Sequence, residues 1–239
     1  MKINIEALDQ TIRKICEEVK CMADEKTEWR NLSEEALLYE VAVCIFGSQM
    51  VYEHSIAMVD FIKKKGMLCE AAFTNNYNQY EENLRALLSE PLNIEKNGIS
   101  RKIKPRFKNR LSKLLTRTIQ NVYGNEITIK YLLNSAANSL HARKLLVNKI
   151  FGFGPKQASL FLRRIGYCSE LAVLDTHILD YLKISSGVDM KATALSKLTW
   201  YEYVESAFKR ISDDFGYSVG CVDLATWVTM RVAKREYTI

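Results

Sequence analysis

Residues 145–182 of this 239-residue chain read LLVNKIFGFGPKQASLFLRRIGYCSELAVLDTHILDYL. Apolar residues at helical spacing lie on both sides of the short segment Phe151–Pro155, which predicts two helices joined by a tight turn. Gly152 and Gly154 permit a sharp reversal and a close approach of the backbone to a ligand, and Pro155 suits the first position of the second helix. This stretch therefore predicts a hairpin of two helices built around two glycines.

The turn of this hairpin has the composition of an anion site. Backbone N–H groups in such a turn, backed by the positive end of the next helix, suit one phosphate of a DNA strand. Two glycines between helices are equally compatible with a plain tight turn. The residues that follow the turn, Lys156 and, 19 positions later, Asp175, are needed to choose between these two interpretations.

Both segments resemble the signature of the helix-hairpin-helix superfamily that includes endonuclease III and the 8-oxoguanine DNA glycosylases. Phe151–Lys156 is similar to its apolar-Gly-apolar-Gly-x-Lys turn, and Leu174–Ile178 is similar to its apolar-Asp-x-His-apolar box. The interval of 19 positions resembles that of the 8-oxoguanine branch. The resemblance implies a hairpin motif over residues 142–166, two helical lobes with the active site in the cleft between them, and Lys156 and Asp175 as the catalytic residues.

Base excision explains why this pair would be needed. A neutral lysine amine can attack the anomeric carbon of the sugar, expel the base and leave a Schiff base, so the charged ammonium form of Lys156 has to be disfavoured. The first turn of a helix, with its positive dipole end and partial desolvation, acts in that direction. Asp175 would stabilise the positive charge that develops on the sugar. In isolation, Lys156 is also compatible with a solvated surface residue and Asp175 with a helix N-cap.

The number and clustering of the cysteines distinguish the branches of the superfamily. The endonuclease III branch carries four clustered cysteines after the aspartate box, whereas here only Cys221 follows Cys168, so we expect no iron–sulfur cluster and no metal. A lysine at the end of the hairpin favours a combined glycosylase and lyase. Over roughly residues 33–231 the chain is similar to the type 2, archaeal-type 8-oxoguanine DNA glycosylases, whose run of Gly, Lys, Phe, Leu and Arg it follows from Gly154 to Gly166.

The C-terminal helix carries the residues that this resemblance assigns to base recognition. Asp223 and Trp227 match the group's Asp-Leu-x-x-Trp helix, and their spacing puts both on one helix face. Trp227 would stack on the extruded base and Asp223 would accept a hydrogen bond from its edge. An amphipathic helix that simply packs Trp227 into the core is the alternative. The chain runs twelve residues beyond Trp227 to Ile239, which departs from the family's short ending.

Further DNA contacts are expected at two other places. Gln49 follows an apolar helix where superfamily members insert a polar side chain into the gap left by the flipped base. Arg106, Phe107 and Arg110 resemble the start of a helix in the same group. They belong to a run without acids that contains Arg101, Lys102, Lys104, Arg106, Lys108, Arg110, Lys113 and Arg117. We interpret this run as a basic, apolar-backed helix for a phosphate backbone, although a solvated surface has the same composition.

The remaining pattern predicts a nearly all-α chain that forms a single two-lobed unit over residues 1–239. One lobe is expected from residues 1–32 and 140–239, the other from 33–139. Helices are expected near 34–47, 52–65, 79–89, 105–122, 127–139, 142–150, 156–165, 176–182, 198–215 and 221–233. Residues 91–104 are expected to form a long connection, because they combine prolines with asparagines and a glycine.

These expectations lead to one function and two alternatives. The chain is expected to be a bifunctional DNA glycosylase and AP lyase for an oxidised base, foremost 8-oxoguanine, acting as a monomer on damaged double-stranded DNA. A glycosylase for another lesion, such as an oxidised pyrimidine, and a non-catalytic hairpin DNA-binding module are the alternatives. With no apolar signal segment or membrane span, we expect an intracellular location, cytoplasmic or nucleoid-associated, or nuclear in a eukaryote.

Overall fold

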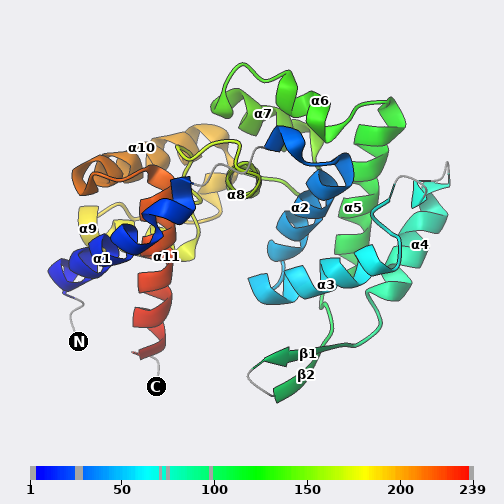
Figure 1. Cartoon of the computed structure of the whole chain (residues 1–239), viewed down its shortest axis with the longest axis horizontal. Coiled ribbons are helices and arrows are strands. Elements are labelled where there is room, and N and C mark those ends of the chain that lie inside the picture. Colours follow the sequence, from blue (N-terminus) through cyan, green and yellow to red (C-terminus); the bar gives the residue numbers. More distant parts are fainter. Residues whose placement is uncertain (1–3, 25–28, 70–71, 74–75, 97–98, 237–239) are drawn as a thin grey trace. The chain divides into compact units, whose positions relative to one another are not determined.

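The computed structural model describes residues 4–24, 29–69, 72–73, 76–96 and 99–236. The chain divides into two compact units, here called the terminal unit (Met1–Trp29 with Gly154–Ile239) and the central unit (Arg30–Phe153). The backbone therefore passes from one unit to the other between Phe153 and Gly154, inside the expected hairpin. The prediction of a nearly all-α fold is confirmed, since helices make up both units (Figure 1).

The terminal unit is centred on the first and the last helix of the chain, which pack against each other. Its helices are α1 (Ile5–Asp24), α8 (Pro155–Arg164), α9 (Thr176–Ser186), α10 (Leu198–Phe215) and α11 (Val219–Glu236), with a short 3₁₀ turn η4 (Ala194–Ser196). Helix α11 packs against α1, α9 and α10. Fully buried apolar residues fill the space between these helices, among them Ile12, Ile178, Leu182, Phe208 and Val222. The helix that carries Asp223 and Trp227 thus runs through the core of this unit.

The central unit contains the remaining elements. They are η1 (Trp29–Asn31), which begins at the boundary, α2 (Glu34–Gly47), α3 (Tyr52–Lys64), α4 (Tyr77–Leu87), β1 (Leu92–Lys96), β2 (Ile99–Ile103), α5 (Lys108–Val122), η3 (Tyr123–Asn125), α6 (Ile129–Asn134) and α7 (Ser139–Lys149). Residues Leu37 and Leu38 and the stretch Val41–Phe46 of α2 are buried, so α2 is the central helix of this core. It packs against α3, α5 and α6 (Figure 1).

Local side chains set several helix starts. Ser33 accepts a hydrogen bond from the Ala36 N–H at 3.2 Å and is the N-cap of α2. Asn138 accepts from the His141 N–H at 2.9 Å and starts α7. The expected helix 127–139 is therefore wrong at its end, because α6 stops at Asn134 and the Asn138 cap begins a new helix.

The expected connection 91–104 is wrong in one respect, because it contains a β-hairpin. Strands β1 and β2 pair antiparallel, with Leu92 opposite Ile103 and Lys96 opposite Ile99 (Figure 1). The sequence between the paired ends is Asn97-Gly98, the dipeptide most favoured in two-residue hairpin turns. That signal could have identified the hairpin.

The basic run also differs from its prediction as one helix. Lys102 lies on β2, Lys104 in the following connection and Arg106 in a turn, and α5 begins only at Lys108. The first residues of the run are extended because they pair with β1, and Pro105 cannot donate a hydrogen bond to continue that pairing. The exposed cations of the run are therefore spread over a strand, a turn and a helix.

Candidate active site

The first half of the hairpin turn is held by α5 of the central unit. The Thr118 hydroxyl accepts a hydrogen bond from the Phe151 N–H at 3.0 Å and donates to the Phe151 carbonyl at 3.4 Å. The Asn121 amide donates to the Lys149 carbonyl at 2.8 Å, and the Arg117 guanidinium lies 4.2 Å from the centre of the Phe151 ring. These contacts satisfy the backbone at the end of α7 and fix the entry into the turn.

The two glycines of the turn have different roles. Gly152 has a φ of +89°, and a Cβ placed on it would lie 3.0 Å from Leu114 Cδ1. Gly154 is extended, with a φ of −101°, and a Cβ there would meet only Gln157 Oε1 at 3.7 Å. Only Gly152 is therefore required by the reversal of the chain. At Gly154 the remaining reason for a glycine is the expected close approach of a phosphate, which stays a prediction.

Alanine at the two glycines should separate folding from binding. We expect Gly152→Ala to lower the free energy of unfolding by about 1–2 kcal/mol, because an L-residue resists this φ and Leu114 has to move. Gly154→Ala should unfold like the wild type and bind undamaged duplex more weakly. Urea denaturation and fluorescence anisotropy measure the two effects.

Gly216→Ala is the matched control, because Gly216 has a φ of +77° and a Cβ placed on it would meet nothing within 4 Å. Its loss of stability reports the backbone strain without the Leu114 contact. If Gly154→Ala binds duplex with the affinity of the wild type, Gly154 is not part of a phosphate site.

Lys156 occupies the first turn of α8. Gly154 is the N-cap without a side-chain cap, Pro155 is the first residue of the helix, and Lys156 is the second. Among the described residues, the backbone N–H groups of Lys156 and Gln157 have no hydrogen-bond acceptor. The half-buried Lys156 side chain thus starts at the positive end of a helix with free N–H donors.

Asp175 is the N-cap of α9. Its Oδ1 atom accepts hydrogen bonds from the His177 N–H at 2.9 Å and the Ile178 N–H at 3.0 Å. Its Oδ2 atom has no hydrogen bond to the described residues, and the side chain is half-buried. The capping alternative considered from the sequence is therefore correct in geometry, but it uses only one of the two carboxylate oxygens.

The segment before Asp175, residues 171–174, has no regular secondary structure, is buried and is held by side chains from α10 and α11. The Ala172 N–H donates to Glu205 Oε1 at 2.9 Å, the Val173 N–H to Asp223 Oδ2 at 2.6 Å and the Leu174 N–H to the Tyr201 hydroxyl at 3.0 Å. Tyr201 also donates to the Ala172 carbonyl at 2.8 Å. Sequence reasoning did not identify Glu205 and Tyr201, because no local pattern marks them.

Both carboxylate oxygens of Asp223 make contacts inside the terminal unit. Besides Val173, it contacts Arg163 of α8, with 2.8 Å between Oδ1 and the guanidinium Nη1. Arg163 Nη1 has no hydrogen bond of good geometry among the described residues, so this contact is an ion pair. Burial raises the pKa of Asp223, while Arg163 and the Val173 N–H oppose that shift. The expected hydrogen bond from Asp223 to a base edge stays a prediction.

Trp227 lies one turn further along α11 and is half-buried against the core of the terminal unit. The Arg231 guanidinium lies 4.8 Å from the centre of its ring, and the ring of His177 approaches it edge-on at 6.3 Å. Burial lowers the pKa of His177, and the charge of Asp175 opposes that shift. Lys156, Asp175, Asp223 and Trp227 all belong to the terminal unit, whereas a site in a cleft between lobes stays a prediction.

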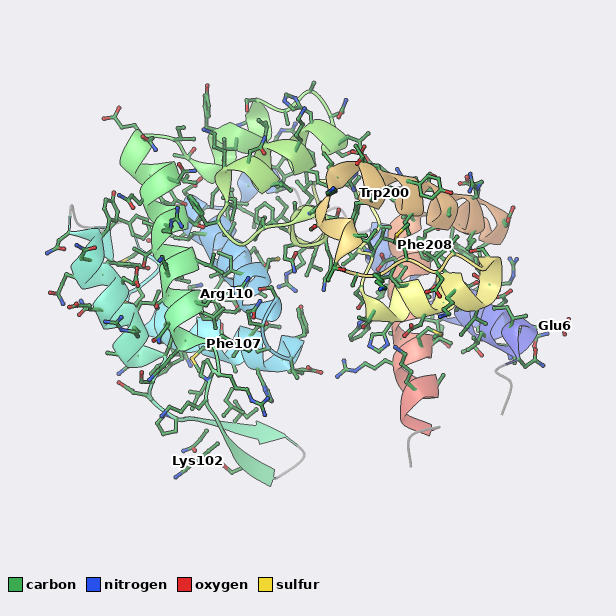
Figure 2. All side chains as sticks on the ribbon, turned by 180° about the vertical axis from the view of Figure 1, so that it is seen from behind. Glu6, Lys102, Phe107, Arg110, Trp200 and Phe208 are labelled. Carbon is green, nitrogen blue, oxygen red and sulfur yellow. The ribbon has the colours of Figure 1, made fainter. Side chains whose placement is uncertain are left out.

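The residues expected to contact DNA outside this group belong to the central unit. Gln49 follows α2, is half-buried and donates to the Ser48 hydroxyl at 3.3 Å. Arg106 and Arg110 are exposed. Figure 2 shows Arg110 and Phe107 at the start of α5 and Lys102 on the hairpin, and Phe107 is 49% exposed.

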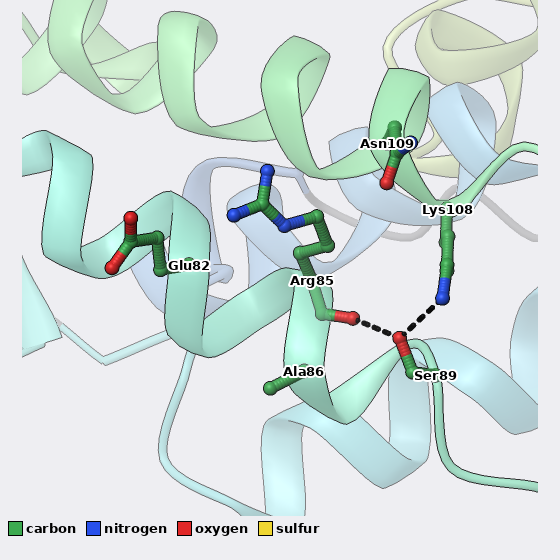
Figure 3. Close-up of a pocket in the computed structure, with 6 residues that line it drawn as sticks. All are labelled: Glu82, Arg85, Ala86, Ser89, Lys108 and Asn109. Carbon is green, nitrogen blue, oxygen red and sulfur yellow. Dashed lines mark hydrogen bonds between the residues drawn. The ribbon is translucent and has the colours of Figure 1, made fainter.

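An open pocket in the central unit has none of the predicted catalytic or base-recognition residues in its lining. It is lined by residues of α4, by Ser89 just after that helix and by the start of α5, namely Glu82, Arg85, Ala86, Ser89, Lys108 and Asn109 (Figure 3). The Lys108 ammonium donates to the Ser89 hydroxyl at 2.9 Å, and this hydroxyl donates to the Arg85 carbonyl at 2.7 Å. The Lys108 ammonium thus has a hydrogen-bond partner inside the unit, whereas Arg106 and Arg110 have none among the residues that the structure describes.

Two absences hold for the part of the chain that the structure describes. No group of three or more histidine, cysteine or acidic side chains is placed to hold a metal ion there. Nor does any helix among these residues combine the length and apolar character needed to cross a bilayer.

Comparison with known proteins gives the same family as the sequence motifs. A sequence model described as 8-oxoguanine DNA glycosylase matches residues 19–217. The 8-oxoguanine DNA glycosylase/AP lyase of Thermoplasma volcanium is 35% identical over 136 residues, which are 57% of this chain and 63% of that relative. The enzyme of the same name from Sulfolobus acidocaldarius is 30% identical over 162 residues, 66% of this chain and 76% of the relative. The first alignment thus spans less than two thirds of the relative's length.

Solved structures support the fold. The 8-oxoguanine DNA glycosylase of Thermotoga maritima superposes with a TM-score of 0.68 at 22% identity, covering 94% of this chain and 96% of that one. The Methanocaldococcus jannaschii 8-oxoguanine glycosylase/lyase, solved with DNA that contains 8-oxoguanine, superposes with a TM-score of 0.64 at 23% identity over 90% and 94% of the two chains. At these identities the likeness concerns the fold.

Proposed function

The chain belongs to the 8-oxoguanine DNA glycosylase family, and on that basis we propose that it excises 8-oxoguanine from duplex DNA and then cleaves the strand as an AP lyase. The observation that carries the proposal is the arrangement of the two motif residues at helix N-termini of one unit. Lys156 lies in the first turn of α8, and Asp175 caps α9 with one oxygen while the other has no partner among the described residues.

Lys156 is the nucleophile in this proposal. Its neutral amine forms a bond to C1′ of the sugar while the bond from C1′ to the base nitrogen breaks, and the departing base takes up a proton. Opening of the sugar ring breaks the C1′–O4′ bond and leaves a Schiff base on Lys156. Loss of a C2′ proton then expels the 3′ phosphate, which cleaves the strand by β-elimination.

Asp175 acts on the first of these steps. As the base leaves, positive charge develops on the sugar, and a fixed carboxylate stabilises that charge. The two N–H donors that hold Oδ1 orient the group before the reaction, so the free Oδ2 can face the sugar without reorganisation. Trp227 supplies the surface on which the extruded base stacks. No step of this mechanism requires a metal or another cofactor.

DNA binding in this proposal combines the turn at Gly152 and Gly154 with the exposed arginines of the central unit, while Gln49 fills the space of the extruded base. Alanine at Arg106 and Arg110 should lower the slope of log K against log salt by about 0.9 for each lost phosphate contact, for damaged and undamaged duplex alike. Lys183→Ala, which removes an exposed lysine paired with Asp189 at 2.8 Å, is the control for a change in net charge. If the slope of log K against log salt stays the same in the double variant, these arginines make no phosphate contact and are only solvated surface residues.

A panel of duplexes with one defined lesion each tests the function. Denaturing gels should show base release and strand cleavage at 8-oxoguanine in preference to oxidised pyrimidines and uracil. Preference for an oxidised pyrimidine would retain the mechanism and change the substrate, whereas binding without any cleavage would make the chain a DNA-binding module. The monomeric state and the intracellular location stay predictions.

A further inference from the structure

We propose that Asp223 is a positioning residue, which joins Arg163 of the lysine-bearing helix α8 to the backbone of Val173 and thereby holds Asp175 in place relative to Lys156. This inference rests on the proposed function, because it assigns the catalytic roles to Lys156 and Asp175. It gives Asp223 a role in the orientation of the reacting groups, distinct from the recognition of the base.

The contact with Val173 acts close to Asp175 in the chain. Val173 precedes Asp175 by two positions, and its N–H donates to Asp223 Oδ2 at 2.6 Å. The neighbouring Ala172 and Leu174 N–H groups donate to Glu205 and Tyr201. Three consecutive N–H groups are thus held by buried side chains rather than by a neighbouring strand. The position of Asp175 consequently depends on α10 and α11 as well as on its own helix.

Arg163 connects the same carboxylate to the helix of Lys156. It lies on α8 seven positions after Lys156, so a rigid helix of two turns links the two residues. Its Nη1 contacts Asp223 Oδ1 at 2.8 Å, and its Nη2 donates to the Gly220 carbonyl at 2.8 Å. One guanidinium therefore holds both a side chain and a backbone group of α11.

Gly220 extends this connection to the segment that leads to Asp175. Its N–H donates to the Ser169 carbonyl at 2.8 Å. A Cβ on Gly220 would lie 3.2 Å from this carbonyl oxygen and 3.4 Å from Arg163 Nε, so a side chain there would push the three groups apart. Helix α8, helix α11 and residues 169–173 therefore form one connected set of polar contacts.

Burial makes this set rigid and leaves Asp223 little freedom to bind a ligand. The side chains of Arg163 and Asp223 are 18% and 7% exposed. Both oxygens of Asp223 are in use, Oδ1 by Arg163 and Oδ2 by Val173. Each oxygen has a further lone pair, but with the side chain only 7% exposed a base edge could reach it only if the groups packed around Asp223 moved apart.

The first test compares Asp223→Asn with the wild type in single-turnover excision of 8-oxoguanine. The amide has nearly the same shape but cannot accept from Val173 and pair with Arg163 at once. We expect the maximal rate to fall by about 10- to 100-fold, because small misplacements of reacting groups have effects of this size. The half-saturating enzyme concentration, and the ratio of affinities for lesion and undamaged duplex, should stay as in the wild type. A loss of that ratio would assign Asp223 to base recognition and overturn the inference.

Two variants outside Asp223 check the same point if Asp223→Asn is poorly folded. Tyr201→Phe removes the hydroxyl that holds Leu174 and Ala172, and Arg163→Lys keeps the charge but cannot contact Asp223 and Gly220 together. Both should lower the maximal rate without changing lesion affinity. Thr229→Val is the matched control, because it removes a buried hydrogen bond within α11, to the Ala225 carbonyl at 2.8 Å, that has no link to Val173. Wild-type rates for both Tyr201→Phe and Arg163→Lys would overturn the inference.

A double-mutant cycle then tests whether Asp223 affects the excision rate through Asp175. If Asp223 acts through Asp175, Asp223→Asn should cause little further loss of rate in an Asp175→Asn background. An equal fold-loss in both backgrounds would mean an independent role and contradict the inference. Failure of the proposed function is seen separately, since wild-type protein would then release no 8-oxoguanine and form no adduct through Lys156.

Discussion

Sodium borohydride added during turnover should join the wild-type chain covalently to lesion-containing DNA, and Lys156→Gln should form no adduct and cleave no DNA. The reductant converts the imine between the lysine and the sugar into a stable amine, so the complex survives a denaturing gel. Tryptic peptide mapping should place the DNA on the peptide that contains Lys156. The rate of strand cleavage should fall to the uncatalysed level in the variant, because one group serves both excision and elimination.

Binding supplies the control for this result. Lys156→Gln should bind undamaged duplex nearly as well as the wild type, since the backbone N–H groups of the first turn of α8 and the exposed arginines remain. Efficient base release by a wild type that cannot be trapped would make water the nucleophile and the enzyme monofunctional. An adduct on a different lysine would show that the motif alignment is wrong.

Asp175→Asn should slow the excision of 8-oxoguanine by about 100-fold or more, because a neutral amide cannot stabilise the charge that develops on the sugar. The same variant should be trapped better on DNA with a pre-formed abasic site than on intact lesion DNA, since base departure has already occurred there. Single-turnover gels with the two substrates measure this contrast.

The geometry of Asp175 makes this substitution informative. The amide oxygen of asparagine can accept from the His177 and Ile178 N–H groups as Oδ1 does, so the cap of α9 is retained. Asp175→Ala is the comparison, because it removes the cap as well and should lower the free energy of unfolding by about 1 kcal/mol. If a folded Asp175→Asn variant excises the base at the wild-type rate, Asp175 serves only as the cap of α9.

The hairpin and its neighbourhood show which parts of the fold can be predicted from sequence. Gly152 is required where the chain reverses, and Pro155 starts α8, both as expected. The misjudged parts are the basic run, the connection before it and the end of the helix expected over residues 127–139. Strand pairing between β1 and β2 overrides the appearance of a continuous basic helix, because the two-stranded ladder satisfies the backbone of residues 99–103 and helix propensity is a weak preference that such pairing overrides.

Sequence alone therefore determined the family, the helical class and the position of Lys156 and Asp175 at two helix starts, because turns, caps and apolar periodicity depend on residues within a few positions of one another. It did not determine what surrounds Asp175. The bond from the Val173 N–H to Asp223 joins residues 50 positions apart, and the ion pair of Asp223 with Arg163 brings in a third element. Only packing of α8, α10 and α11 decides such contacts, since they follow from which buried polar groups meet in the core and no local spacing encodes them.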